Sequence, residues 1–319
     1  MKSKWKKYSV ISLFAWCGGL DLWFEWWFDY LWKKYKSNNF DVIWANDIDL
    51  NACKTYEEYF WENSIHHADI WDELDKDNIP KSADIVLWGF PCQDFSHAWK
   101  RLWFESKRWR LYQAMIEVIK KTKPVLFMAE NVKWLLTIDN GWAIKQIIED
   151  FWAIGYTINH QLFLTANYWV PQMRERVIIV WTRIDTLPKF EFPNATHTKE
   201  NWVSLKSAIW DLENIEEWGI DNHYWSKAKK NKWQWNKVVW ANKPWPTMRS
   251  EHHGNIEFHW NETRRLSARE AARIQTFPDN FIFLPSTSSA YKQIWNAIPP
   301  IFWWNLATAI QNFLDTNLQ

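Results

Sequence analysis

The sequence is short of glycine, with 7 in 319 residues, although average proteins contain about 7% glycine. No G-x-G-x-x-G phosphate-binding turn is present, which argues against a nicotinamide-dependent oxidoreductase. The three cysteines, Cys17, Cys53 and Cys92, form no C-x-x-C pair and suit a reducing interior better than a disulfide framework. No apolar run reaches the roughly 18 residues of a membrane span, and no N-terminal signal is visible. We therefore expect a cytoplasmic protein that does not bind a membrane.

An excess of charge of one sign is also absent, since 38 Lys and Arg stand against 37 Asp and Glu. A global positive field that would attract nucleic acid is thereby excluded, and any basic surface must be local. The length is sufficient to bury a sizeable core, in one large domain or one domain and a half.

Tryptophan is the residue in excess, with 30 copies. It occupies places where a chain normally turns, as at Trp16 before Cys17-Gly18-Gly19 and at Trp88 before Gly89. A tryptophan-rich core or an aromatic binding surface would place these residues on periodic apolar faces, but most fall in predicted loops and at strand ends. The pattern indicates systematic replacement of glycine by tryptophan.

Short apolar runs alternate with amphipathic segments along the first 183 residues, which predicts a doubly wound, mostly parallel α/β sheet. Ligands of such sheets bind at the carboxyl ends of the strands, where Phe14, Asp47, Cys92 and Glu130 fall. The predicted strands are 10–14, 41–45, 84–87, 124–128 and 176–180, and the predicted helices are 51–60, 111–121, 143–151 and a segment from about residue 20.

The alternation ends near Arg183, and residues 187–260 are rich in Pro, Asn and Lys with little period. We predict one domain over 1–183, completed by 287–319, and a smaller irregular domain over 184–286. Within the latter, Ser267 and Glu270 have the spacing of a capping box at the start of a helix. A last helix over 302–314 is expected to pack back on the sheet.

Cys92 lies behind a proline in Gly89-Phe90-Pro91-Cys92-Gln93, and Glu130 follows the next predicted strand. A thiolate can attack an electron-poor ring carbon while a carboxylic acid protonates the ring. A lone cysteine is more often a small buried apolar residue, and a lone glutamate a solvated carboxylate. Cys92 and Glu130 indicate a catalytic pair only through their order among the other motifs.

Six blocks, in this order, resemble the DNA cytosine-5 methyltransferases of bacterial restriction-modification systems. The resemblance extends over nearly the whole chain except the middle of the irregular region. The blocks are Phe14-Ala15-Trp16-Cys17-Gly18-Gly19, Pro91-Cys92-Gln93, Glu130-Asn131-Val132, Gln172-Met173-Arg174-Glu175-Arg176, Arg264-Arg265-Leu266-Ser267 and Gln293-Ile294-Trp295-Asn296-Ala297.

The resemblance implies methyl transfer to carbon 5 of a flipped cytosine through a covalent Cys92 adduct. Glu130 would act at ring nitrogen 3, and Arg174 and Arg176 would lie near the target nucleotide, with Arg176 the better candidate for contact with the base. A surface salt-bridge pair is the alternative for the two arginines.

The methyl donor implied is S-adenosyl-L-methionine, with no metal. Asp47 would accept the ribose hydroxyls, Ile48 would cover one adenine face, and Asp69 would meet the adenine amine; each acidic residue alone is more often a solvated cap. The complete donor set implied is Phe14, Cys17, Gly18, Gly19, Asp47, Ile48, Asp69, Ile70, Pro91, Leu111, Asn296 and Ala297.

The partner implied is double-stranded DNA, and a cognate restriction endonuclease would act separately, with the methyltransferase a monomer. The loop over 96–111 carries five basic residues and would close over the DNA. Pro246-Thr247-Met248 resembles the target-recognition signature of the family. The DNA contacts implied are Gln93, Ser96, Lys100, Arg101, Gln172 and Thr247.

The chain departs from the family where glycine is usual, and we expect tryptophan there to impair donor binding and stability. Two rival functions remain open: a catalytically dead DNA-binding module with the same fold, and an RNA methyltransferase of the same family. The tryptophans concerned are Trp16, Trp88, Trp99, Trp103, Trp109, Trp134, Trp169, Trp181 and Trp295.

Overall fold

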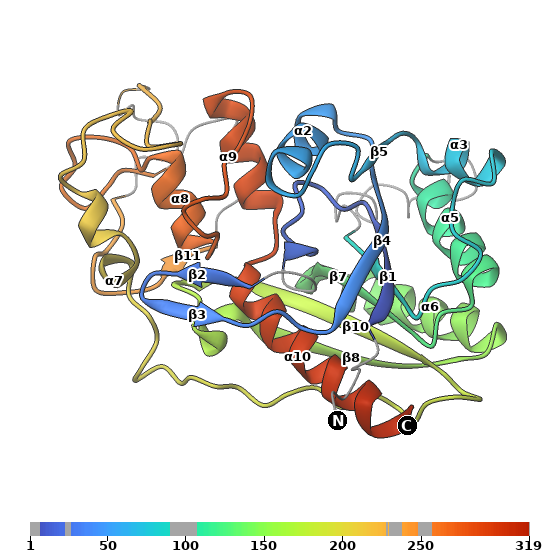
Figure 1. Cartoon of the computed structure of the whole chain (residues 1–319). Coiled ribbons are helices and arrows are strands. Elements are labelled where there is room, and N and C mark those ends of the chain that lie inside the picture. Colours follow the sequence, from blue (N-terminus) through green and yellow to red (C-terminus); the bar gives the residue numbers. More distant parts are fainter. Residues whose placement is uncertain are drawn as a thin grey trace, which may run out of the picture.

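The computed structural model describes residues 7–22, 27–89, 107–227, 229, 238–247 and 257–318, without the side chains of 107–109, 138 and 139 (Figure 1). The strands are β1 (Tyr8–Leu13), β2 (Phe28–Tyr30), β3 (Lys33–Tyr35), β4 (Phe40–Asp47), β5 (His66–His67), β6 (Ile85–Trp88), β7 (Leu126–Val132), β8 (Tyr156–Leu164), β9 (Gln172–Met173), β10 (Glu175–Arg183) and β11 (Trp245–Pro246). The α-helices are α2 (Leu50–Tyr59), α3 (Ile70–Asp75), α5 (Lys107–Thr122), α6 (Trp142–Ala153), α7 (Leu205–Ile209), α8 (Ala268–Ile274), α9 (Thr287–Asn296) and α10 (Pro300–Asn317).

The main sheet has seven strands in the order β5-β4-β1-β6-β7-β10-β8. The first five are parallel to one another, and β10 runs antiparallel to both β7 and β8. The predicted doubly wound, mostly parallel sheet is therefore confirmed. Every strand predicted from the apolar runs is found, within a few residues of its expected bounds.

Both faces of this sheet are buried, which explains why its strands are continuous apolar runs rather than alternating ones. Val10 belongs to the cluster of buried side chains that includes α8, α9 and α10. Its neighbour Ile11 belongs to the opposite cluster, which includes α3, α5 and α6. Successive side chains of a strand point to opposite faces, so one strand supplies both clusters. The result is a layer of helices on each face of the sheet (Figure 1).

Several elements were not predicted from the sequence. The hairpin of β2 and β3 is one of them, and part of the amphipathic segment expected from about residue 20, residues 23–26, lies outside the described residues. Strand β8, at the edge of the sheet, was not predicted because it carries the polar run Asn159-His160-Gln161, which is compatible with an edge that is only half covered. Helix α9 was not predicted either, although Ser286 caps it by accepting from the backbone N–H of Ser289.

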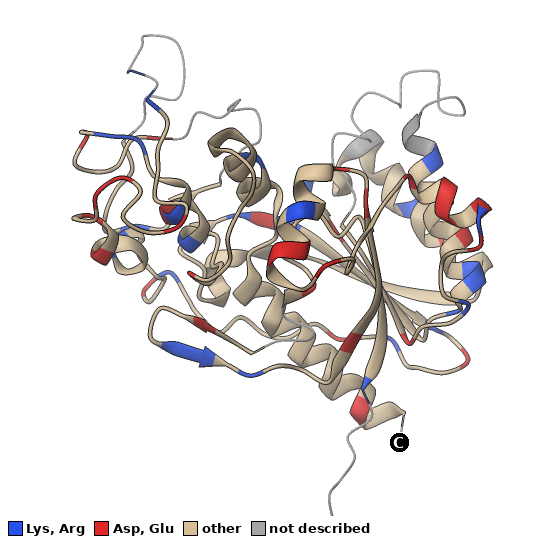
Figure 2. Ribbon diagram, turned by 45° about the horizontal axis from the view of Figure 1, so that its top comes forward, with Lys and Arg blue, Asp and Glu red and all other residues tan. Residues whose placement is uncertain are grey.

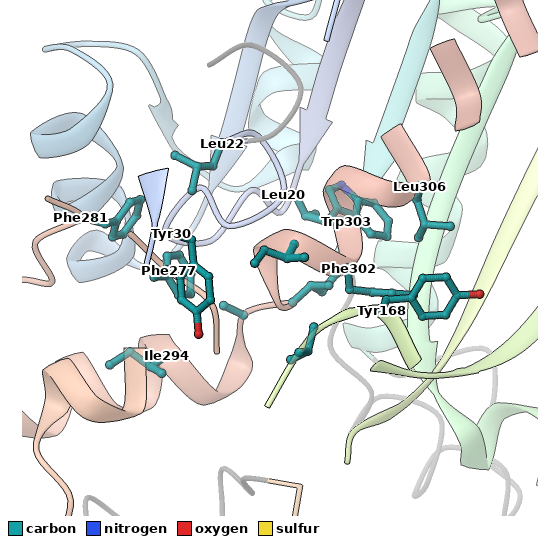
Figure 3. Packing of buried hydrophobic residues seen from close by; sticks show 14 of the residues in the cluster. Leu20, Leu22, Tyr30, Tyr168, Phe277, Phe281, Ile294, Phe302, Trp303 and Leu306 are labelled. Atoms are coloured by element: carbon teal, nitrogen blue, oxygen red, sulfur yellow. The ribbon is translucent and has the colours of Figure 1, made fainter. Parts of the chain in front are cut away.

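The last helix, α10, packs back onto the rest of the chain, as predicted. Figure 3 shows Phe302 and Trp303 of α10 in one apolar cluster with Leu20, Tyr168 and Leu306, and all five side chains are at least nine-tenths buried. Residues 287–318 thus help to bury the face of the sheet that carries Val10. That fits the expectation that this segment completes the first domain, although the domain boundaries themselves remain a prediction.

The region over 184–286 is largely irregular. Its described part contains two short α-helices, α7 and α8, and one two-residue strand, β11. The predicted capping box is confirmed. Ser267 Oγ accepts from the backbone N–H of Glu270, and the Glu270 carboxylate accepts from the backbone N–H of Ser267. No helix in the described part of the chain is long and apolar enough to cross a membrane.

The tryptophans are not confined to loops and strand ends, so that expectation was wrong for several of them. Trp44 and Trp181 lie inside strands and Trp303 inside α10, all three buried. Three other positions, however, have the backbone conformation that favours glycine. The φ angles are 54° at Trp16, 66° at Trp169 and 68° at Trp218.

Candidate functional site

The carboxyl ends of β1, β6 and β7 lie side by side. Leu13 pairs with Trp88, and Trp88 pairs with Ala129, so these three residues form one row across the sheet. The residues that follow them are Phe14, Gly89 and Glu130. The three segments singled out by the motifs therefore leave the sheet at one edge, as expected for a ligand site in a parallel sheet.

Glu130 and Arg176 meet at this edge as an ion pair between Glu130 Oε1 and Arg176 Nε, with each side chain 12% exposed. Glu130 is opposite Ile178 on the antiparallel partner β10, and Arg176 is two residues before Ile178. Side chains two apart on a strand share a face, so the guanidinium and the carboxylate reach the same side. Arg176 also donates from Nη1 to the carbonyl of Glu175. Among the described residues, no partner is found for the second oxygen of Glu130, Oε2.

Gly89 marks where the predicted nucleophile loop leaves the sheet. Its N–H donates to the carbonyl of Leu13 at 3.3 Å, and a Cβ at this position would lie 3.2 Å from the carbonyl oxygen of Phe14. The loop thus begins between the turn after β1 and Glu130. Six predicted site residues fall outside the described residues: Pro91, Cys92, Gln93, Ser96, Lys100 and Arg101.

The turn after β1 requires glycine at Gly18. Its φ is +88°, and a Cβ there would lie 2.4 Å from Phe60 Cε2. Gly19 is less restricted, with Phe277 and Ala297 at 3.2 Å and 3.4 Å from such a Cβ. The turn is consequently held between α2 on one side and the segment after α9 on the other, which brings the predicted residues Gly19 and Ala297 together.

Asp47 ends β4 beside this turn. It is 5% exposed; its Oδ2 accepts from the Trp16 N–H at 2.9 Å and its Oδ1 accepts from the Asp49 N–H at 2.8 Å. Burial raises the pKa of the Asp47 carboxyl, while the backbone N–H groups act in the opposite direction. A carboxylate oxygen accepts more than one hydrogen bond, so each oxygen keeps capacity for a ligand hydroxyl. Ile48 follows with 64% of its side chain exposed.

The other predicted donor residues differ in how accessible they are. Asp69 caps α3 by accepting from the Trp71 N–H at 2.9 Å, and Asn296 is exposed at the end of α9. In contrast, Cys17 is fully buried and Ile70 is 2% exposed. The side chains of Cys17 and Ile70 belong to the core, so any donor contact at these positions would come from the backbone.

Gln172 is fully buried, and its amide donates to Gln275 Oε1 at 2.6 Å. Gln275 in turn donates to the carbonyls of Ile294 and Ala297. The predicted DNA contact by the Gln172 side chain is not compatible with this burial. The side chain joins the β9 segment to the end of α9 instead.

Arg174 is also buried, with 2% of its surface exposed, and donates from Nη1 to the carbonyl of Trp295 at 3.0 Å. It lies between β9 and β10. The ion pair with Glu130 is made by Arg176. The alternative of an exposed surface pair is excluded for Arg174 by its burial.

Thr247, the second of the two predicted DNA contacts that the structure describes, follows β11. Strand β11 pairs in parallel with β9, and Thr247 Oγ1 donates to the carbonyl of Met173 at 2.6 Å. The target-recognition signature is therefore attached to the same segment that leads into Arg174 and Arg176.

Two polar residues at this edge were missed by the sequence analysis. Asp21 is fully buried beneath the turn and accepts from Ser12 Oγ at 2.6 Å, and burial raises the pKa of Asp21 to about 6. Asn131 is 2% exposed; its Oδ1 accepts from the Val132 N–H, and its amide N–H groups have no partner among the described residues. An acidic residue directly after Gly-Gly-Leu was the available signal for Asp21.

Positive charge does not gather on one face of the described structure. Figure 2 shows Lys and Arg interspersed with Asp and Glu over both the sheet and the smaller region, in line with the balanced composition. Among the described residues, no three His, Cys, Asp or Glu side chains come together as a candidate metal site. The described groups at the edge include a carboxylate, a guanidinium and a glycine-containing turn.

The sequence and the fold were compared with known proteins. The sequence model of the family described as C-5 cytosine-specific DNA methylase matches residues 8–312. The type II methyltransferase M.NgoFVII of Neisseria gonorrhoeae is 32% identical over 350 residues, which covers 100% of this chain and 90% of that protein. M.BspRI of Lysinibacillus sphaericus is 33% identical, with 96% and 82% covered.

Solved structures agree with the fold. A protein encoded within an E. coli prophage superposes with a TM-score of 0.71 at 19% identity, covering 97% of this chain and 100% of that chain. The S. pombe Dnmt2 methyltransferase gives a TM-score of 0.64 at 16% identity, covering 97% and 99%.

Proposed function

Because the chain belongs to the C-5 cytosine-specific DNA methylase family, we propose that Cys92, Glu130 and Arg176 form its catalytic group. Methyl transfer from S-adenosylmethionine to carbon 5 of cytosine in DNA is the reaction of this chain, as the family and its type II methyltransferase relatives indicate. The observation that supports the catalytic group most directly is the Glu130–Arg176 pair, at the edge where the segment leading to Cys92 leaves the sheet.

Cys92 would act as the nucleophile. Carbon 5 of cytosine is too weak a nucleophile to take a methyl group unaided. The thiolate of Cys92 forms a bond to carbon 6, and the electron pair of the former double bond becomes available at carbon 5. After carbon 5 has been methylated, loss of its proton to a base and expulsion of the thiolate restore both the ring and the cysteine. The target base must leave the stack to reach this site.

Glu130 would act at ring nitrogen 3. A proton held between the carboxyl and nitrogen 3 draws electrons from the ring as the thiolate adds, and it returns to the carboxyl oxygen when the thiolate leaves. Arg176 holds Oε1 of Glu130, which directs Oε2 to the base. The N–H groups of Arg176 that remain can contact the same base.

The residues present fit an adenosyl donor in three respects. Gly18 has the positive φ of a close-approach turn, Asp47 keeps acceptor capacity at the end of β4, and Ile48 exposes an apolar side chain next to it. S-adenosylmethionine, when bound, supplies an electrophilic methyl group. Asp47 would hold the ribose hydroxyls, Ile48 one face of the adenine, and Asp69 the adenine amine.

The partner of this site would be double-stranded DNA. Thr247 and the irregular region over 184–286 would read its sequence, since β11 attaches this segment to the strand that leads to Arg176. A separate restriction endonuclease with the same recognition sequence, a monomeric state and a cytoplasmic location are part of the same proposal. The type II methyltransferase relatives support the separate endonuclease, and the free thiols of Cys17 and Cys53 suit a reducing interior.

Sequence-resolved detection of methylcytosine in DNA from cells that express the chain tests this function. A Cys92→Ser variant should leave no methylcytosine, whereas Lys120→Ala, which changes an exposed residue in the last turn of α5, should leave the methylation pattern intact. Methylcytosine that persists in Cys92→Ser would remove Cys92 from its assigned role. Parallel mapping of RNA from the same cells separates the DNA enzyme from an RNA methyltransferase.

A further inference from the structure

Trp16 connects the two segments between which the proposed donor site lies, one through its side chain and the other through its backbone. Its indole Nε1–H donates to the carbonyl of Gln293 on α9 at 3.0 Å. Its backbone N–H donates to Asp47 Oδ2 at the end of β4. One residue therefore bonds both the carboxylate proposed for the donor ribose and the helix that ends at Asn296.

Lys292 covers the Trp16 ring from the solvent side. Lys292 Nζ lies 5.3 Å from the centre of the Trp16 ring and pairs with Asp49 Oδ2 at 2.9 Å. Asp49 is bonded in turn through its N–H to Asp47 Oδ1. The indole is consequently held by a hydrogen bond at one end and by a cation–π contact over its face.

The connection to α9 can open without leaving a buried polar group unpaired. The carbonyl of Gln293 also accepts from the Ala297 N–H at 3.1 Å, so it keeps a donor when the indole departs. Lys292 keeps Asp49 as its partner. Trp16 has a φ of 54°, a left-handed backbone conformation that is strained for any residue with a side chain. Relief of this strain favours movement of the turn.

We propose that Trp16 is a strap across the donor site, whose indole must leave Gln293 before an adenosyl sulfonium compound can bind. This inference rests on the proposed donor site at Asp47. The strap lowers the apparent donor affinity, because only the fraction of molecules with the strap open can bind. Trp16 thus sets the affinity for the donor without touching the reacting atoms.

Isothermal titration calorimetry of the full chain with S-adenosylmethionine and with S-adenosylhomocysteine tests the strap. For Trp16→Gly we expect both compounds to bind about tenfold more tightly, as for a strap closed in about nine molecules of ten. Trp16→Phe retains an aromatic ring but loses the N–H, and should bind about threefold more tightly than the parent. Affinities equal to or weaker than the parent in both variants would overturn the proposal.

Trp218→Gly is the matched control. Trp218 has a similar φ of 68°, is 68% exposed and contacts Tyr224 rather than the donor turn, so its replacement relieves backbone strain without opening the site. Its donor affinity should equal that of the parent. A gain as large as that of Trp16→Gly would show that strain relief alone is responsible and would overturn the strap.

Asp47→Ala in the Trp16→Gly background distinguishes failure of the strap from failure of the proposed site. If that double variant binds the donor as well as Trp16→Gly does, the site at Asp47 is wrong. If it loses binding while Trp16→Gly and the parent have equal affinities, the site is right and the strap is wrong. Thermal unfolding of each variant verifies that the proteins compared are folded.

Discussion

Arg176 Nε contacts Glu130 Oε1 across two antiparallel strands, at the edge of the sheet where the segment toward Cys92 begins. The two side chains come from motifs far apart in the chain, and the register of β7 against β10 places them on one face. A guanidinium that holds one carboxylate oxygen leaves the other oriented toward a substrate.

Loss of either partner should reduce catalysis more than stability. We expect Glu130→Gln to lower the methylation rate at least 100-fold, in line with the contribution of about 10²–10⁴-fold from general acid–base groups. Arg176→Ala should lower it about 10- to 100-fold, because the carboxylate loses its orientation. Single-turnover methylation of a DNA duplex measures both effects.

The neighbouring exposed pair of Lys133 and Glu175 provides the control. The two charges are 3.1 Å apart, and both side chains are about half exposed. Lys133→Ala should leave the single-turnover rate within twofold of the parent, since exposed pairs contribute about 0–1 kcal/mol. An equal loss in Lys133→Ala and Arg176→Ala would mean that general electrostatics, and not orientation of Glu130, controls the rate.

Thiol alkylation should be selective in the native protein. Burial raises the pKa of Cys53 to about 12, and it raises the pKa of the fully buried Cys17 thiol as well, so neither forms a reactive thiolate at neutral pH. Iodoacetamide at pH 7.5 should modify Cys92 first and all three cysteines after denaturation. Peptide mass spectrometry identifies the modified thiol, and native labelling of Cys17 ahead of Cys92 contradicts the assignment.

Gly18→Ala should destabilise the protein and weaken donor binding. The new Cβ would meet Phe60 at 2.4 Å in addition to the strain of φ +88°. Gly155→Ala isolates the strain, because Gly155 has φ +91° with nothing within 4 Å of an added Cβ. We expect a loss of about 1 kcal/mol for Gly155→Ala and about 1–3 kcal/mol more for Gly18→Ala. Urea denaturation measures the difference, and equal losses would show that Phe60 moves aside freely.

Replacement of Gln172 decides between a structural role and DNA contact. Gln172→Ala removes a buried donor from Gln275 and should lower the free energy of unfolding by about 1–3 kcal/mol. The exposed Gln113 on α5 is the control, and Gln113→Ala should change that free energy by less than about 0.5 kcal/mol. Duplex-DNA affinity, measured where both variants are folded, should match the parent. A selective loss of affinity in Gln172→Ala would restore the direct contact.

Asp21 should make stability depend on pH. Burial raises the pKa of its carboxyl to about 6 in the folded protein, against 3.8 for an ordinary Asp carboxyl, so the folded state binds the proton more tightly. Its contribution is therefore complete below about pH 4 and is lost as the pH rises through 6, by an amount on the order of 3 kcal/mol. Asp21→Asn keeps an acceptor for Ser12 but does not titrate. The difference in unfolding free energy between the two proteins should change between pH 4 and 6; a constant difference contradicts the assignment.

The order of the apolar runs was enough to predict the sheet. Strands buried on both faces, such as β1 and β6, are recognisable locally because most of their residues are apolar. The motif residues Phe14, Asp47 and Glu130, which lie at or near the carboxyl ends of β1, β4 and β7, could be placed at one edge for the same reason. The capping box at Ser267 was also predicted, since its spacing is a local property of one helix turn.

Contacts between distant segments were decided by the tertiary structure. The burial of Gln172 against Gln275, the pairing of Arg176 with Glu130 and the bond from Trp16 to Gln293 each depend on which elements become neighbours. Strand order and helix packing determine those neighbours, and neither follows from residue spacing within one segment. The chain's own pattern therefore specified the sheet and the chemical groups at its edge, while long-range packing determined which of those groups meet, which are buried and which remain accessible to a ligand.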